Sequence, residues 1–203
     1  MCPVPTTAAS DCSQAGSGTL PDYLAPGLRV LSVGINPSLR AVREGFYFPN
    51  PHNRFWPALN ASGLLQAPVV PGPEAMTLIL RRDRIGFTDL CKSPSSMAHH
   101  LRTADYRLGA ARLAATIAEC RPPVLWFHGA TAYRAFCRET QSMPSTPIHP
   151  GLQAPTFAGA RIFITPNPSP ANARYSLAML IDAYRALAEV LATPATQPAA
   201  RCS

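Results

Sequence analysis

The sequence has a single lysine, Lys92, and only 14% of its residues are charged. Lysine and arginine together still outnumber aspartate and glutamate by 18 to 11, so arginine carries nearly all of the formal net charge of +7. Because the guanidinium group binds phosphate through a planar fork and stacks on bases, this composition favours a polyanionic partner such as a nucleic acid. A basic solvated surface would give the same count, so charge alone favours nucleic acid only modestly.

The six cysteines include no Cys-x-x-Cys pair, and the five histidines have no spacing typical of metal ligands. These absences argue against a zinc site, a disulfide framework and a four-cysteine iron–sulfur cluster. The motifs of phosphate-loop enzymes, dinucleotide-binding enzymes and serine hydrolases are also missing. We therefore predict reduced thiols, no metal and no cofactor.

No apolar run is long enough to span a bilayer, and the first residues lack the basic start and apolar centre of a secretion signal. We expect a monomeric, cytoplasmic protein without membrane contact, associated with the nucleoid if it is bacterial. Its 203 residues suit one domain. We predict a disordered leader over residues 1–21, the domain over 22–192, and a disordered tail over 193–203.

Four apolar stretches predict β-strands, and helical patterns separate them. The predicted strands are residues 28–35, about 84–90, 123–128 and 161–165. The predicted helices are residues 53–62 with Asn53 as N-cap, 104–120, a shorter one from about 130, and 176–191. This alternation predicts an α/β fold, a single three-layer α/β/α domain with a central, mainly parallel four-stranded sheet. The proline-rich segment 141–155 is predicted to be a loop.

Two of the predicted strands end in the same turn, Asn-Pro-Ser, at residues 36–38 and 167–169. A single Asn-Pro-Ser turn is common at the ends of strands and would not by itself indicate a site. Ligands of open parallel sheets, however, bind outside the carboxyl ends of the strands, where both turns lie. Thr88 and Asp89 end a third strand and Gly129 follows the fourth, so the sequence predicts a site at this edge.

The stretch from Gly34 to Trp56, GINPSLRAVREGFYFPNPHNRFW, joins the first turn to an aromatic cluster and a helix start. Its order and spacing resemble the first motif of the mismatch-specific uracil-DNA glycosylases, the bacterial relatives of thymine-DNA glycosylase. The segment from Thr165 to Ser176, TPNPSPANARYS, resembles the second motif of the uracil-DNA glycosylase superfamily. In that superfamily this loop enters the minor groove and fills the gap left by the flipped base. The resemblance covers about residues 24–191.

The resemblance implies a uracil-DNA-glycosylase-like fold and a monofunctional base-excision repair enzyme acting on double-stranded DNA. Such an enzyme flips a deaminated or mismatched base out of the duplex and hydrolyses its N-glycosidic bond, leaving an abasic site. Uracil opposite guanine is the first choice of substrate. The alternatives are thymine, hypoxanthine, xanthine or an etheno adduct, and a member of the superfamily that binds DNA without catalysis.

The resemblance also implies roles for particular residues. Asn36 would hold the attacking water. Asp89 is an auxiliary catalytic candidate on a separate ground, because it is a carboxylate at a neighbouring strand end, and its alternative is a turn or capping role. The implied substrate-binding residues are Gly34, Ile35, Phe48, Asn53, Thr88 and Asn167, with Phe48 stacking on the base and backbone groups of Ile35 and Phe48 reading its polar edge. The implied DNA contacts are Ser38, Ser169, Pro170, Ala171, Asn172 and Arg174.

The sequence departs from the superfamily's pattern in two respects. Asn167 stands where many members have histidine. Pro170, Ala171 and Asn172 stand where mismatch-specific relatives often place a larger apolar wedge. Arg174 would either read the base opposite the lesion or contact a phosphate.

Overall fold

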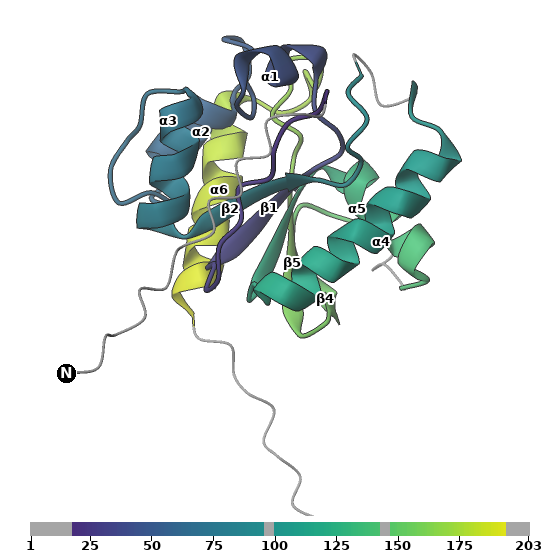
Figure 1. Cartoon of the computed structure of the whole chain (residues 1–203). Helices are drawn as coiled ribbons and strands as arrows, with labels where there is room; N and C mark the ends of the chain where they lie inside the picture. Colours follow the sequence, from purple (N-terminus) through teal and green to yellow (C-terminus); the bar gives the residue numbers. More distant parts are fainter. Residues whose placement is uncertain (1–17, 96–99, 143–146, 194–203) are drawn as a thin grey trace, which may run out of the picture.

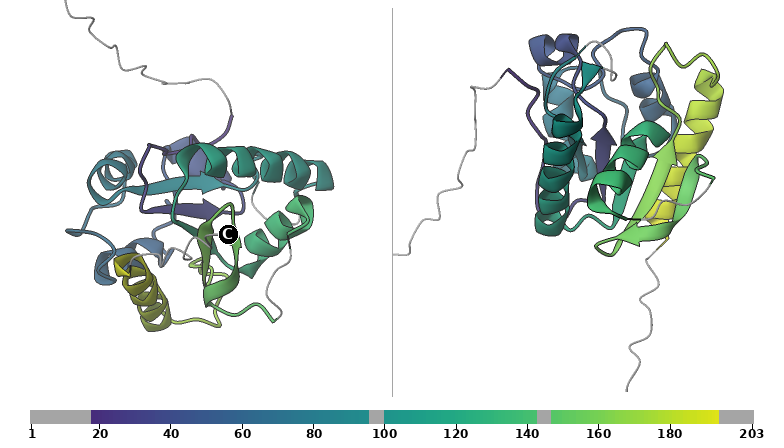
Figure 2. Two further views of the ribbon diagram at one scale, coloured as in Figure 1. Left: turned by 90° about the horizontal axis from the view of Figure 1, so that it is seen from below. Right: turned by 90° about the vertical axis from the view of Figure 1, so that its right-hand side faces the viewer.

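A computed structural model describes residues 18–95, 100–142 and 147–193. A five-stranded sheet in the order β2-β1-β3-β5-β4 forms its centre (Figure 1). The strands are β1 (Val30–Gly34), β2 (Ile85–Asp89), β3 (Val124–His128), β4 (Gly151–Phe157) and β5 (Ala160–Thr165). The predicted α/β/α fold is confirmed, because the first three strands and β5 run parallel and helices cover both faces (Figure 2).

The sheet has one more strand than the four we predicted. Strand β4 pairs antiparallel with β5, inside the segment that we predicted to be a loop. Its register is irregular between Leu152 and Thr156, and Pro155 falls in this irregularity. An edge strand tolerates proline because one of its sides has no ladder to complete. The prolines of this segment therefore mark an edge strand rather than a loop.

The helices form two layers, with α4 and α5 on one face of the sheet and α2, α3 and α6 on the other (Figure 1). Their bounds are α1 (Leu39–Glu44), α2 (Phe55–Ala61), α3 (Pro73–Leu78), α4 (Thr103–Cys120), α5 (Ala130–Thr140) and α6 (Leu177–Ala192), and a π-helix, η1 (Ile79–Asp83), follows α3. The sequence predicted α2, α4, α5 and α6 but not α1, α3 or η1. None of the helices in the described segments is long and apolar enough to cross a bilayer.

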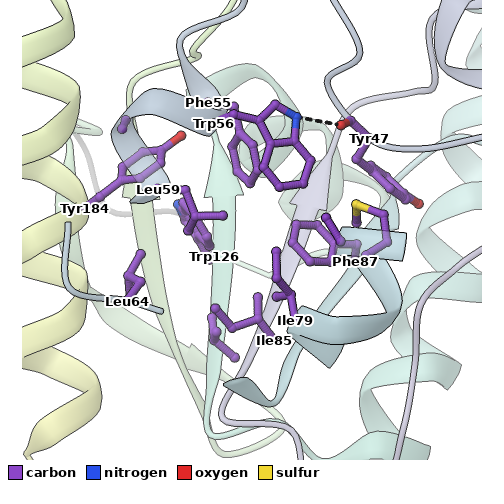
Figure 3. Packing of buried hydrophobic residues seen from close by; sticks show 14 of the residues in the cluster. Tyr47, Phe55, Trp56, Leu59, Leu64, Ile79, Ile85, Phe87, Trp126 and Tyr184 are labelled. Atoms are coloured by element: carbon purple, nitrogen blue, oxygen red, sulfur yellow. Dashed lines mark hydrogen bonds between the residues drawn. The ribbon is translucent and has the colours of Figure 1, made fainter. Parts of the chain in front are cut away.

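An aromatic cluster fixes α2 against the sheet. Phe55 stacks on Trp126 of β3 with ring centroids 6.0 Å apart, and Tyr184 of α6 packs edge-on against Trp126 at 4.8 Å (Figure 3). The Trp56 indole N–H donates to the carbonyl oxygens of Tyr47 and Phe48, each at 3.2 Å. These contacts hold the loop before α2 at the carboxyl edge of the sheet.

The ordered domain begins earlier than predicted. Leu20 is buried in the core, and Tyr23 forms a two-bond antiparallel bridge with Phe87 of β2. The leader prediction is therefore wrong for residues 18–21, because an apolar side chain there finds a place in the core. Residues 1–17 and 194–203, which make up most of the predicted leader and tail, lie outside the described residues.

Candidate functional site

A cavity of about 560 Å³ opens at the carboxyl edge of the sheet. Asp89 and His128, the last residues of β2 and β3, line it together with both Asn-Pro-Ser turns. The predicted site residues that line this cavity are Gly34, Ile35, Asn36, Ser38, Phe48, Asn53, Asp89, Asn167, Ser169, Pro170 and Ala171. The structure thus brings residues more than 100 positions apart into one pocket.

Thr88 is the predicted substrate-binding residue that the structure places elsewhere. Its buried hydroxyl accepts from Arg112 of α4 at 3.4 Å, on the opposite face of β2 from Asp89. Successive side chains of a strand point to opposite faces, so Thr88 cannot share the cavity with Asp89. We correct its assignment to a structural contact with α4.

Asn172 and Arg174 also lie outside the cavity lining. The Asn172 amide donates to the carbonyl of Asn167 at 3.0 Å. This bond lies within the segment of the second motif, Thr165 to Ser176, which we call the second loop, and it stabilises that loop. Arg174 is exposed and lies over the ring of Tyr175, 5.8 Å from its centroid. Both remain on the loop that we expect to face DNA.

The side-chain amide of Asn36 is held in one orientation. Its Nδ2 lies 3.1 Å from the carbonyl oxygen of Pro37, 3.3 Å from that of Ser93 and 2.9 Å from Oγ of Ser95. Carbonyl oxygens only accept hydrogen bonds, so the atom facing them must be the NH₂ group. The other atom, Oδ1, is therefore left as an acceptor at the cavity.

Phe48 forms an aromatic wall of the cavity. Its ring stacks on Phe55 with centroids 4.0 Å apart and planes 20° apart. Its backbone is left-handed, with φ of 58°, a conformation that costs energy in a bulky residue. The carbonyl of Phe48 is engaged by Trp56, so its N–H is the backbone group left to read a base, and no described residue accepts from it.

Asp89 is a carboxyl group in an unusual setting. It is buried, and this burial raises its pKa to about 7, although Lys92 and Arg112 oppose the rise. Both cations bind Asp22 instead, at 2.6 Å and 3.0 Å, and Oδ2 of Asp89 has no hydrogen-bond partner among the described residues. A Cβ on residue 34 would overlap Oδ1 of Asp89, so only glycine lets this carboxyl lie against β1. Asp89 caps none of the helices in the described segments.

Arg54, which the sequence reasoning missed, joins the two motifs. Its backbone N–H and its Nε both donate to the carbonyl of Pro168, at 3.2 Å and 3.3 Å. Its two terminal nitrogens donate to the carbonyls of Ser169, Asn172 and Tyr175. One guanidinium group at the N-cap of α2 thus holds the second loop through four carbonyl oxygens. Asn53, which we predicted as this N-cap, lies one residue earlier, and its Oδ1 accepts from the Phe55 N–H at 2.9 Å, so it still caps the first turn of α2.

His128 was also missed. It ends β3, is 5% exposed, and its Nε2 lies 2.8 Å from Oγ of Ser32. The sequence contained a signal, because the predicted strand 123–128 ends at His128 and the next residue, Gly129, was placed at this edge. Among the residues that the structure describes, no group of three histidine, cysteine or acidic side chains could hold a metal ion.

Comparison with known proteins places these features in a family. The model of the uracil DNA glycosylase superfamily matches residues 21–190. A solution NMR structure of a Methanosarcina acetivorans protein, provisionally assigned as a uracil DNA glycosylase, has a similar fold, with a TM-score of 0.51 at 19% identity. The similarity covers 84% of this chain and 97% of that one.

Proposed function

This chain belongs to the uracil DNA glycosylase superfamily, and from that premise we propose that it is a monofunctional glycosylase for uracil opposite guanine in duplex DNA. The observation that carries the proposal is the fixed Asn36 amide, which lines one cavity together with the Phe48 ring. One group supplies an oriented acceptor for water and the other an aromatic face for a base.

The proposed reaction breaks the bond between the base and the sugar. The flipped base stacks on Phe48, and Oδ1 of Asn36 accepts a hydrogen bond from the water that attacks the sugar. An amide is no general base at neutral pH, so Asn36 acts by holding the water in line. The ionised Asp89 carboxylate offsets the positive charge that develops on the sugar. The Phe48 N–H is available as a donor to a base carbonyl.

Residues of both turns line the cavity, and the turns are the proposed contacts with the DNA backbone. Oγ of Ser38 accepts from the Ala41 N–H at 3.0 Å, and Oγ of Ser169 accepts from the Ala171 N–H at 3.3 Å. Each hydroxyl keeps its own proton for donation to a phosphate oxygen. The second loop presents Pro170 and Ala171 to the gap that the flipped base leaves.

The test of this proposal is release of uracil from a duplex oligonucleotide with one uracil–guanine pair. Alkaline cleavage should then reveal an abasic site at that position. Parallel duplexes with thymine, hypoxanthine, xanthine or an etheno adduct define the lesion range. A protein that binds these duplexes and releases no base would be the non-catalytic member of the superfamily.

Phe48→Ala should slow uracil release by about 5- to 150-fold, since stacking of one base on an aromatic ring is worth roughly 1–3 kcal/mol. Single-turnover rates and the melting temperature of the variant are the measurements. The left-handed backbone at residue 48 strains alanine as well, so some loss of stability is expected. A variant with the wild-type rate would show that no base stacks there.

The rate of the wild-type enzyme should rise as the pH increases through about 7, the pKa of Asp89, because the ionised carboxylate is the form that stabilises the sugar cation. Asp89→Asn should be slower at pH 8 and should lose this rise. A pH profile of single-turnover rates between pH 5.5 and 8.5 checks both expectations. An unchanged profile in the variant would assign the titration to another group.

The Asp89 carboxyl should lower the stability of the folded protein as the pH rises, whereas it should raise the rate. Its pKa is raised on folding, so the folded state keeps the proton while the unfolded chain loses it near pH 4. The resulting stability is present below about pH 4 and is lost as the pH rises to about 7, a change on the order of 4 kcal/mol. Asp89→Asn should therefore melt higher than wild type at pH 8, with a smaller gain at pH 4.5.

Duplex binding should weaken steeply with salt, because phosphate contacts release counterions. Arg174→Ala separates the two roles left open for this exposed side chain. If Arg174 reads the opposite base, the variant should lose more affinity for a uracil–guanine duplex than for a uracil–adenine duplex. Equal losses, with a shallower salt dependence, would identify a phosphate contact.

A further inference from the structure

His128 is a buried polar residue of the cavity lining to which the proposed reaction gives no role. Its ring lies 5.1 Å from the Phe48 ring, edge to face, and both residues line the pocket. Its Nε2 contacts Ser32, and its Nδ1 is buried with no hydrogen-bond partner among the described residues. A buried polar atom without a partner costs roughly 1–3 kcal/mol, so a ligand that supplies one gains that amount.

The hydrogen-bond pattern favours one tautomer of His128, the one that leaves fewer polar groups unpaired. If Nε2 carried the proton and donated it to Ser32, the Ser32 hydroxyl proton would need another acceptor, and the described residues offer none. If Ser32 donates to Nε2, its proton is satisfied and the imidazole proton resides on Nδ1. The group left over is then a buried N–H donor on a residue that lines the cavity.

The ring stays neutral in this position. Burial lowers the pKa of His128 to about 3, so imidazolium does not form near neutral pH. The groups around the ring are aromatic, with Trp126 at 4.5 Å and Phe55 at 5.5 Å between centroids. None of these neighbours is a carboxylate that could stabilise a protonated ring, and their packing holds the ring plane in place.

We propose that His128 reads the flipped base by donating its Nδ1 proton to a carbonyl oxygen, and so selects deaminated bases over their amino parents. This role rests on the proposed glycosylase function. Uracil carries an oxygen at the position where cytosine carries an amino group, and hypoxanthine differs from adenine in the same way. An oxygen accepts the Nδ1 proton, whereas an amino group places donor against donor and leaves both unsatisfied.

A cycle of substrate and protein changes tests the contact. The wild type, His128→Phe and His128→Asn are compared on duplexes with uracil, 4-thiouracil or 2-thiouracil opposite guanine. Sulfur is a weak acceptor, so 4-thiouracil should slow the wild type by roughly ten-fold more than it slows His128→Phe. The 2-thio change should slow both proteins alike. His128→Asn keeps an N–H donor and should recover part of the uracil rate that His128→Phe loses.

Tyr184→Phe is the matched control. Like His128, Tyr184 has a buried polar group without a partner among the described residues, its hydroxyl, which this change removes. Tyr184 packs in the same aromatic cluster but does not line the cavity. This variant should respond to both thio-substrates as the wild type does. If His128→Phe responds to 4-thiouracil exactly as the wild type does, the proposed contact is absent.

The tautomer is tested without any substrate, by long-range ¹H–¹⁵N correlation NMR of the wild-type protein. A proton on Nδ1 is expected, and a proton on Nε2 would overturn the proposal even if the variants fail to fold. A wild type that releases no base from any duplex would reject the glycosylase and this role together. Uracil release with the wrong tautomer, or with equal thio effects, would reject the role of His128 alone.

Discussion

Asn36→Ala is expected to slow base release by roughly 10²–10³-fold while leaving duplex binding close to wild type. The amide makes three hydrogen bonds through Nδ2 that fix its oxygen at the cavity. Without Oδ1 the water has no oriented acceptor, and the enzyme keeps only the stacking wall and the carboxylate. Because the lost contact is with water rather than with DNA, the effect belongs in the chemical step.

Single-turnover rates on a uracil–guanine duplex, with binding measured separately, test this expectation. Asn60→Ala is the control for folding, since the Asn60 amide bonds the N–H and carbonyl of Val69 and does not line the cavity. It should lower the melting temperature without a comparable loss of rate. A fully active Asn36→Ala enzyme would overturn the assignment of the site.

The pair of Asn36 and Asp89 gives a further check. If the two side chains act on the same water and the same developing charge, each single variant should be slow and the double variant little slower than the worse of the two. If Asn36 acts alone, Asp89→Asn should stay near the wild-type rate at pH 8. Multiplied losses in the double variant would indicate two separate tasks.

The sequence located the edge of the sheet that carries the site because two strands end in the same turn and ligands bind at carboxyl ends. It could not decide which of Thr88 and Asp89 faces the cavity. Every residue of β2 is buried, so no alternation of polar and apolar side chains marks the two faces. The structure resolves the choice, with Asp89 at the cavity and Thr88 against α4.

Arg54 shows a second limit of the sequence. The residue reads as an ordinary polar position at a helix start, and its partners lie 114 to 121 positions away. These partners are backbone carbonyls, which every residue carries, so no pattern of side chains in the sequence indicates them. A contact of this kind can be recognised only when the fold has brought the two segments together.

Arg54→Lys is therefore expected to lower kcat/KM on duplex uracil–guanine substrate by roughly 10²-fold, the loss that a misplaced group of about 1 Å can cause. Lysine keeps the positive charge but donates from one nitrogen, which cannot reach all four carbonyls that the guanidinium spans. The second loop then loses its fixed position before it meets DNA. On single-stranded uracil substrate there is no gap to fill, so the loss should be several-fold smaller.

The ratio of duplex to single-strand activity separates this positioning role from a general loss of stability, which would lower both activities together. Arg161→Ala is the matched control, because Arg161 also holds backbone carbonyls, those of Val190 and Thr193 at the end of α6, at 2.9 Å and 3.4 Å. It does not line the cavity and should reduce stability while leaving the ratio unchanged. If Arg54→Lys also leaves the ratio unchanged, the hydrogen bonds of Arg54 to the second loop stabilise the fold and do not position that loop for duplex DNA.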